Sequence, residues 1–372
     1  MEGLKVGQEQ KPFYETLDIN KSTMEPKITL TSLQNNNIIY TENTKKLIPK
    51  TKQTNVKCDS IVSIQNLNYT KLENPGLNLC FMNSAIQLII SIKPLSDLLC
   101  YGYCKTYCKN DTFLSENEKI EILNDPNKAI PPEKVAMKFF LIEFETLAIN
   151  MSKNPNRTHS SSKLAKRFED IEPEFTYGDQ WDCVEVMDIF FTQYQKFIHN
   201  ENFDGKNRAQ EVMDSLKVTM RISTQCNKCN NLDIREENES FLFVPLENDV
   251  ENIFKPYYSN YDEFYCEICN GLAGNPHPRL NTGAVQKAQV KNIGQYLFIQ
   301  FGRVVYNADK VTYKVTLPEI NNYLDKNLKL EAWIEHTGKR INSGHYVTIR
   351  RKGETFIRMS DDHLTINKKN SI

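Results

Sequence analysis

The sequence predicts an α+β fold in which helices come first along the chain and strands follow. Apolar residues recur at helical spacing in the segments 80–92, 134–151 and 181–198. After about residue 216, apolar and polar residues alternate as they do in strands, in the stretches VTMRIST, SFLFVPL, QYLFIQFGRVVY, HYVTIRR and TFIRM. Because the two patterns are segregated, we expect separate helical and sheet layers.

Composition and charge are those of a globular protein. Of the 372 residues, 40% are hydrophobic and 25% are charged, and the formal net charge is −1. This balance gives no indication of nucleic acid or an anionic membrane as a partner. The opening residues, MEGLKVGQEQKPFYE, lack the apolar core of a signal peptide, so we expect a reducing compartment, cytoplasmic or nuclear. A monomer is our default expectation for the oligomeric state.

Residues 1–66 precede the first strongly periodic segment. They are polar, rich in Asn, Lys and Thr, and show no sustained hydrophobic period. Such a composition favours a disordered arm over a folded domain.

Cys80 begins the first helical segment, directly after the turn-prone run Asn74-Pro75-Gly76. A thiol at a helix N-terminus lies near the positive end of the helix dipole and near free N–H groups, which favour the nucleophilic thiolate. The alternative is a small buried hydrophobic residue, since free cysteines are among the most buried residues. A partner base is needed to decide between the two.

His345 is the best candidate for that base among the six histidines, because it opens a strand after the flexible lead-in INSG. If Gly353 is the centre of a hairpin, His345 faces Asp361, and Asp362 faces Gly344. A longer turn or a bulge would shift this register by one residue. A carboxylate on one ring nitrogen would fix the tautomer and raise the basicity of the other. The alternative is an ordinary exposed His–Asp contact.

Two C-x2-C pairs predict a four-thiolate zinc site on strand connections. The ligands would be Cys226, Cys229, Cys266 and Cys269. The zinc would be structural, and the alternative is a pair of knuckles that hold no metal. Three further cysteines are spaced four apart, and we expect them to pack in a helix, with a second metal site as the alternative: Cys100, Cys104 and Cys108.

Four segments, in the same order along the chain, resemble the boxes of the ubiquitin-specific proteases. These are a cysteine box, a glutamine–aspartate box, zinc-bearing fingers and a histidine box, and they read LENPGLNLCFMNSAIQLI, DQWDCVEVMDIFF, TQCNKCNNLDIREENESFLFVPL with YCEIC, and WIEHTGKRINSGHYVTIRR with SDDHL. The likeness covers roughly residues 68–367.

The resemblance implies a papain-like cysteine protease shaped like a hand. A helical thumb would span about 67–210, zinc-bearing β fingers about 216–285, and a β palm about 286–368, within a catalytic domain of 67–368. The reaction would be hydrolysis of the bond after the C-terminal glycine of ubiquitin.

The resemblance also implies roles for single residues. Cys80 would be the nucleophile, His345 the general base and Asp361 the orienting acid. Asn74 and Asn78 would form the oxyanion hole, although the stretch before Cys80 is one residue longer than in the family's motif. Ser360 stands where the family commonly has an aromatic residue, and the Trp usual before the two aspartates is absent.

The glutamine–aspartate box would line a channel for the arginine-containing tail of ubiquitin. Its members are Gln180, Asp182 and Glu185, and carboxylates suit an arginine fork. The simpler interpretation is a charged helix start, which the helix dipole favours.

Two other functions remain open at this point. A ubiquitin-binding scaffold with weak or no activity would keep the same fold. A zinc-ribbon nucleic-acid binder should be basic around its knuckles, whereas residues 237–265 are acidic.

Overall fold

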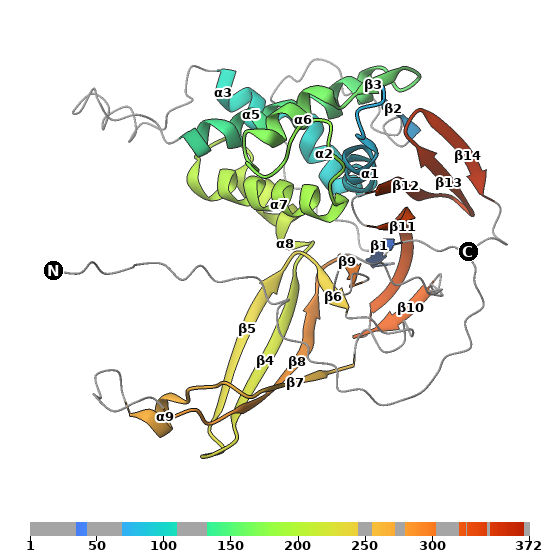
Figure 1. Cartoon of the computed structure of the whole chain (residues 1–372). Helices are drawn as coiled ribbons and strands as arrows, with labels where there is room; N and C mark the ends of the chain where they lie inside the picture. The colour runs from blue at the N-terminus through green and yellow to red at the C-terminus, as the bar shows by residue number, and fades with distance from the viewer. Residues whose placement is uncertain are drawn as a thin grey trace, which may run out of the picture. The chain divides into compact units, whose positions relative to one another are not determined.

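The computed structural model describes residues 35–42, 69–109, 132–244, 255–271, 280–302, 320–324, 326–340 and 343–367 (Figure 1). Helices precede most of the strands, so the predicted α+β class is confirmed. The described residues fall into two units. The smaller contains Arg221–Arg235 and Pro256–Gln289, and the larger contains the main sheet and every described helix except the short one at Glu267–Asn270.

The helical layer of the larger unit is built around a largely apolar interior. Its helices are α1 (Cys80–Ile89), α2 (Lys93–Tyr101), α3 (Tyr103–Lys109), α5 (Pro132–Lys153), α6 (Ser162–Glu169), α7 (Cys183–Asn200) and α8 (Lys206–Asp214). Aromatic rings join them, as where Phe144 of α5 lies 4.6 Å from Phe190 of α7, centroid to centroid. A short parallel pair, β2 (Lys71–Glu73) and β3 (Thr158–Ser160), accompanies this layer.

The predicted helical segments agree with three of these helices. The segment 80–92 forms α1, which ends at Ile89, three residues earlier than expected, and α2 starts at Lys93 with a proline in its first turn. The two longer segments are α5 and α7. All ten residues of α1 are buried, and Figure 1 shows this helix beside β12.

The main sheet has eight strands in the order β14-β13-β12-β11-β1-β9-β6, with β10 paired to β11. Neighbours are antiparallel except β6 and β9. The strands are β1 (Asn35–Glu42), β6 (Leu242–Val244), β9 (Tyr296–Phe301), β10 (Ile320–Tyr323), β11 (Lys326–Arg340), β12 (Ser343–Lys352), β13 (Thr355–Ser360) and β14 (His363–Asn367).

One strand of this sheet comes from the polar N-terminal segment. Residues Asn35–Glu42 form β1, which lies between β11 and β9 and pairs with both. Eight residues of the segment expected to lack structure therefore form a central strand. The rest of the segment 1–66 lies outside the described residues.

A second sheet has four strands in the order β5-β4-β8-β7. They are β4 (Val218–Cys226), β5 (Leu232–Glu239), β7 (Tyr257–Tyr261) and β8 (Ala284–Ile293), and the short helix α9 (Glu267–Asn270) lies in the β7–β8 connection. The first cysteine pair lies where β4 turns into β5 and the second lies at α9, so both are on strand connections as predicted.

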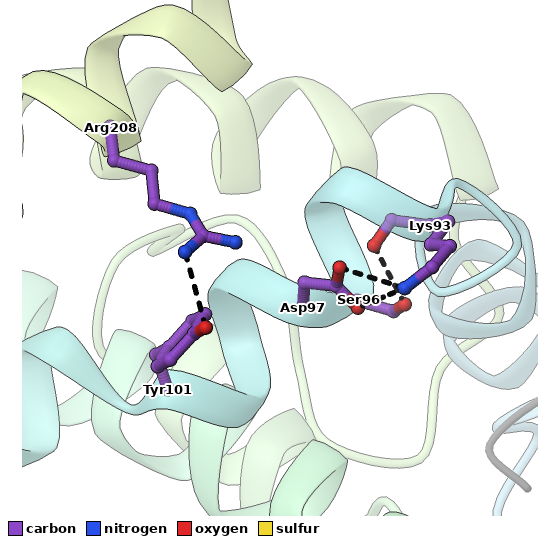
Figure 2. A network of polar contacts seen from close by, with 5 residues as sticks. All are labelled: Lys93, Ser96, Asp97, Tyr101 and Arg208. Atoms are coloured by element: carbon purple, nitrogen blue, oxygen red, sulfur yellow. Dashed lines mark hydrogen bonds and ion pairs between the residues drawn. The ribbon is translucent and has the colours of Figure 1, made fainter. Parts of the chain in front are cut away.

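The outer surface of α2 carries polar contacts. Arg208 of α8 donates a hydrogen bond to the Tyr101 hydroxyl at 3.1 Å, and its guanidinium lies 4.5 Å from the centre of that ring (Figure 2). Lys93 and Asp97 form an ion pair one turn apart on the same helix, at 2.9 Å. The Arg208–Tyr101 contact attaches the C-terminal end of α2 to α8.

Within the described part of the chain, no single helix is both long and apolar enough to cross a membrane. Two consecutive helical segments, Cys80–Ile89 and Lys93–Tyr107, would together be long and apolar enough, but the chain bends by 100° between them.

The Cys100 and Cys104 thiols lie against backbone carbonyls of α5, those of Ala148 and Lys138, each at 3.9 Å. This placement agrees with the packing role. The side chain of Cys108 lies outside the described residues.

Candidate active site

Cys80 is the first residue of α1, as the sequence predicts. The preceding residue, Leu79, caps the helix without a side-chain hydrogen bond, so no capping oxygen competes with the thiol for the free N–H groups of the first turn. Only 3% of Cys80 is exposed to solvent. The cysteine therefore lies at a helix N-terminus and inside the core at once.

Burial raises the pKa of the Cys80 thiol above its usual range. The nearby Asp361 carboxylate raises this pKa further, and hydrogen bonds with the backbone, that of Tyr346 first, lower it only in part. The sequence led us to expect a position that favours the thiolate. In the folded chain desolvation outweighs the helix terminus, so the resting thiol needs a base to remove its proton.

His345 lies on β12, and its Nε2 is 2.8 Å from the Ser360 hydroxyl. Its backbone carbonyl accepts a hydrogen bond from Thr337 on β11 at 3.0 Å. The contact between the Cys80 thiol and the Tyr346 backbone brings the thiol to the residue that follows His345. Two segments 265 positions apart in the sequence thus meet at one place.

The predicted register of the β12–β13 hairpin is wrong by one residue. Lys352 pairs with Thr355, and Thr348 pairs with Met359, so the turn consists of two residues, Gly353 and Glu354, and is not centred on the glycine. Two-residue turns with a left-handed glycine are the favoured hairpin connection, and Gly353 has a φ of 58°.

Asp361 follows β13 and turns its carboxylate toward asparagine side chains. Its Oδ2 accepts a hydrogen bond from Asn74 Nδ2 at 3.1 Å, and its Oδ1 accepts one from Asn83 Nδ2 at 2.8 Å. Its backbone carbonyl accepts the Leu72 N–H at 3.3 Å. A φ of 51° is uncommon for any residue but glycine, and these contacts hold it.

The two asparagines predicted for the oxyanion hole lie in different places. Asn74 bridges Asp361 and the loop before the helix, because its Oδ1 accepts the Leu79 N–H at 3.1 Å. Asn78, with a φ of 52°, donates instead to the carbonyl of Gly178 at 2.8 Å. An amide nitrogen carries two hydrogens, and the bond to Asp361 uses one of those of Asn74.

Asn83 is a site residue that the sequence analysis did not single out. It is 2% exposed, donates to the Glu73 carbonyl at 3.1 Å as well as to Asp361, and accepts the Ser161 hydroxyl at 2.6 Å. The signal was a polar residue one turn after Cys80 on a mostly apolar helix. Its buried amide joins α1, the end of β2, Asp361 and the start of α6.

Gln180 holds the residues that precede His345. Its Oε1 accepts the Gly344 N–H at 3.0 Å, and its Nε2 lies 3.4 Å from Nε2 of the buried His336. The His336 ring stacks on Tyr346 with centroids 4.2 Å apart. A Cβ at Gly344 would meet the Thr337 carbonyl and the His336 ring, which explains the glycine in the lead-in.

The acidic members of the same box begin α7. The Asp182 carboxylate caps the helix by accepting the Val184 N–H at 3.0 Å. Glu185 is exposed as a residue, but partial desolvation of its carboxyl and repulsion from Asp182 and other nearby acids raise its pKa to about 7. Such a carboxyl gains from a cationic partner.

The four cysteines of the knuckles form one cluster within the smaller unit. Their sulfur atoms all lie within 4.8 Å of one another, with Cys226 at 3.9 Å from Cys269 and Cys229 at 3.6 Å from Cys266. The edges of a tetrahedron of sulfurs around zinc are close to these separations, given a Zn–S bond of about 2.3 Å. The donor set therefore fits a structural zinc ion.

Comparison with known proteins agrees with this geometry. The family model described as "Ubiquitin carboxyl-terminal hydrolase" matches residues 70–372. The "Probable ubiquitin carboxyl-terminal hydrolase 9" of Schizosaccharomyces pombe is 24% identical over 203 residues, which are 49% of this chain and 32% of that protein. The "Ubiquitin carboxyl-terminal hydrolase 4" of Arabidopsis thaliana is 22% identical over 168 residues, or 40% of this chain and 44% of that protein. The matches thus span less than half the length of either relative.

Proposed function

The chain belongs to the ubiquitin carboxyl-terminal hydrolase family, and from this premise we propose that it is a cysteine-type deubiquitinase. Its substrates would be proteins joined to the C-terminal glycine of ubiquitin through an isopeptide or peptide bond. The observation that supports this best is the contact of the Cys80 thiol with the backbone beside His345.

In the proposed reaction Cys80 is the nucleophile and His345 is the base. The Nε2 of His345 is engaged by Ser360, which leaves Nδ1 to take the thiol proton. The thiolate sulfur bonds to the glycine carbonyl carbon, and as the C–N bond breaks, the imidazolium gives its proton to the leaving amine. Water then attacks the thioester with His345 as base, which releases ubiquitin and restores the thiol.

Asn74 is our candidate for the side-chain donor of the oxyanion hole. Asp361 and the Leu79 N–H hold both ends of its amide, so the group is already in position when the carbonyl oxygen becomes negative. Loss of one such donor costs about 10²–10³ in kcat. To orient His345 as the sequence predicted, the Asp361 carboxylate would have to move away from the Asn74 and Asn83 amides.

The zinc ion, when bound, would pin the β4–β5 turn to the α9 segment through Cys226, Cys229, Cys266 and Cys269. Metal analysis of the purified chain should find one zinc per molecule. A molecule without zinc would show that the knuckles are held by thiols alone.

We also propose that Asp182 and Glu185 receive a basic side chain of the ubiquitin tail. Glu185 repels its acidic neighbours at neutral pH, and an arginine would relieve that repulsion. A tail peptide in which this arginine is replaced should bind the wild-type chain weakly. It should bind the Glu185→Gln variant no more weakly than it binds wild type.

The test of the whole proposal is labelling by ubiquitin that carries a C-terminal electrophile. We expect wild type to be labelled, Cys80→Ala to be unlabelled, and His345→Ala to be labelled slowly. A second candidate function, a ubiquitin-binding scaffold, is favoured by the raised pKa of the Cys80 thiol. Binding of ubiquitin without labelling by the zinc-loaded chain would establish the scaffold and refute the protease.

A further inference from the structure

We propose that the Ser360 hydroxyl, and not the Asp361 carboxylate, positions the His345 imidazole, while Asp361 holds the amides around Cys80. The proposal rests on the function proposed above. It assigns the orienting role expected of Asp361 to the adjacent Ser360 and gives Asp361 a different role. The hydroxyl lies 2.8 Å from His345 Nε2.

The alternation of side chains along β12 and β13 gives this pairing a structural reason. Thr348 pairs with Met359, so the next step of the register sets Val347 opposite Ser360. Side chains of opposite residues lie on the same face of a sheet, and so do those two positions apart in a strand. Ser360 therefore shares the face of His345, whereas Asp361 is one position out of phase with it.

The contacts of Asp361 agree with this difference of face. Each of its carboxylate oxygens accepts an asparagine amide, that of Asn74 or of Asn83. Neither contact involves β12. With φ at 51°, the chain has already left the extended conformation of β13, so the carboxylate points toward α1 and the loop that precedes it.

A hydroxyl and a carboxylate have different effects on the imidazole. Both accept the Nε2 proton and so leave the Nδ1 lone pair free for the Cys80 proton. A carboxylate also stabilises the imidazolium by its charge, whereas a neutral hydroxyl does not. With Ser360 in this place, the imidazole is oriented without a carboxylate beside its Nε2.

The first experiment follows the ring resonances of His345 in an NMR titration, assigned with His345→Ala. It needs no ubiquitin. We expect Ser360→Asp to raise the pKa of His345 by about one unit or more, since it places a carboxylate beside Nε2. Asp361→Asn should leave the titration much closer to wild type. A larger shift in Asp361→Asn than in Ser360→Asp would overturn the proposal.

The second experiment measures turnover of a fluorogenic ubiquitin substrate over a range of pH. Ser360→Ala should lower kcat about 10-fold or more with little change in KM, because the base loses its orientation. Ser360→Asp should restore kcat and displace the pH profile. Thr355→Ala removes a hydroxyl from the other end of β13, where it bonds the Lys352 carbonyl, and should match wild type.

The NMR titration and the turnover assay test the role of Ser360 and the proposed function separately. If wild type turns over no ubiquitin substrate, the proposed function fails, and the titration still decides what positions His345. If Ser360→Ala keeps full turnover and the wild-type titration, the serine is not the positioning residue.

Discussion

Replacing Asn83 by aspartate tests the buried amide network most directly, because the two side chains have nearly the same shape. Asn83 is 2% exposed and gives hydrogen bonds to the Asp361 carboxylate at 2.8 Å and to the Glu73 carbonyl at 3.1 Å. In Asn83→Asp both donors are lost, and a second carboxylate faces Asp361 at the same separation.

The expected cost can be worked from this geometry. Two charges about 3 Å apart repel by about 5 kcal/mol at an effective dielectric constant of about 20. Loss of the donor to a charged acceptor costs about 1.5–3 kcal/mol. Protonation of one carboxyl caps the repulsion, so we expect Asn83→Asp to lower the free energy of unfolding by about 3–5 kcal/mol at pH 7.5.

The direction in which the stability of Asn83→Asp changes with pH can also be predicted. The new carboxyl has a folded pKa raised above its unfolded value of about 3.9, so the part of the loss that comes from its charge is absent below that value. It grows as the pH rises through the folded pKa. Asn83→Ala, the matched control, also loses the donors but adds no charge.

Urea unfolding of both variants and wild type at pH 4.5, 6 and 7.5 would measure these differences. Asn83→Asp should approach Asn83→Ala in stability at the lowest pH and fall below it at the highest. Equal stabilities of the two variants at every pH, or a loss under about 1 kcal/mol for Asn83→Asp, would refute the network described here.

Three further predictions concern other parts of the chain. Lys138 and Glu201 form an ion pair at 2.9 Å with both side chains 1% exposed, so Lys138→Met alone should cost about 3–5 kcal/mol in urea unfolding, and adding Glu201→Leu should recover part of it. Cys229→Ser should remove the zinc found by metal analysis, whereas Cys100→Ala should retain it. Burial raises the pKa of Glu145 to about 7, so its contribution to stability is present below its unfolded pKa and is lost as the pH rises through about 7. Unfolding of Glu145→Gln should therefore depend less on pH between 5 and 8 than unfolding of wild type. An unchanged slope would exclude that carboxyl as its source.

Local patterns predicted much of this architecture. Helical periodicity after a turn-prone run placed Cys80 at the start of α1, and alternation placed the strands from about residue 216. The spacing of the cysteine pairs predicted a four-sulfur cluster, which the structure contains. In each of these cases the information lies within a few residues of the feature.

Two of the parts that were missed depend on distant residues, and the third, the hairpin register, depends on the local turn. The role of Asn83 needs partners at Glu73, Ser161 and Asp361, none of which lies in its own helix. The hairpin register depended on whether the turn has one or two central residues. The pKa of the Cys80 thiol follows from how completely the rest of the fold covers it, which no local pattern contains.

The strand β1 has a consequence for the order in which the chain can fold as it is made. Residues Asn35–Glu42 leave the ribosome early, yet their partners in the sheet are Tyr296–Gln300 and Leu328–His336. Nearly the whole chain must be synthesised before the strand can pair on both edges. Contacts of such long sequence separation form slowly, and an unpaired strand is open to mispairing during the wait. We expect a nascent chain that stops before residue 326 to leave Asn35–Glu42 accessible to protease, and the 372-residue chain to protect these eight residues.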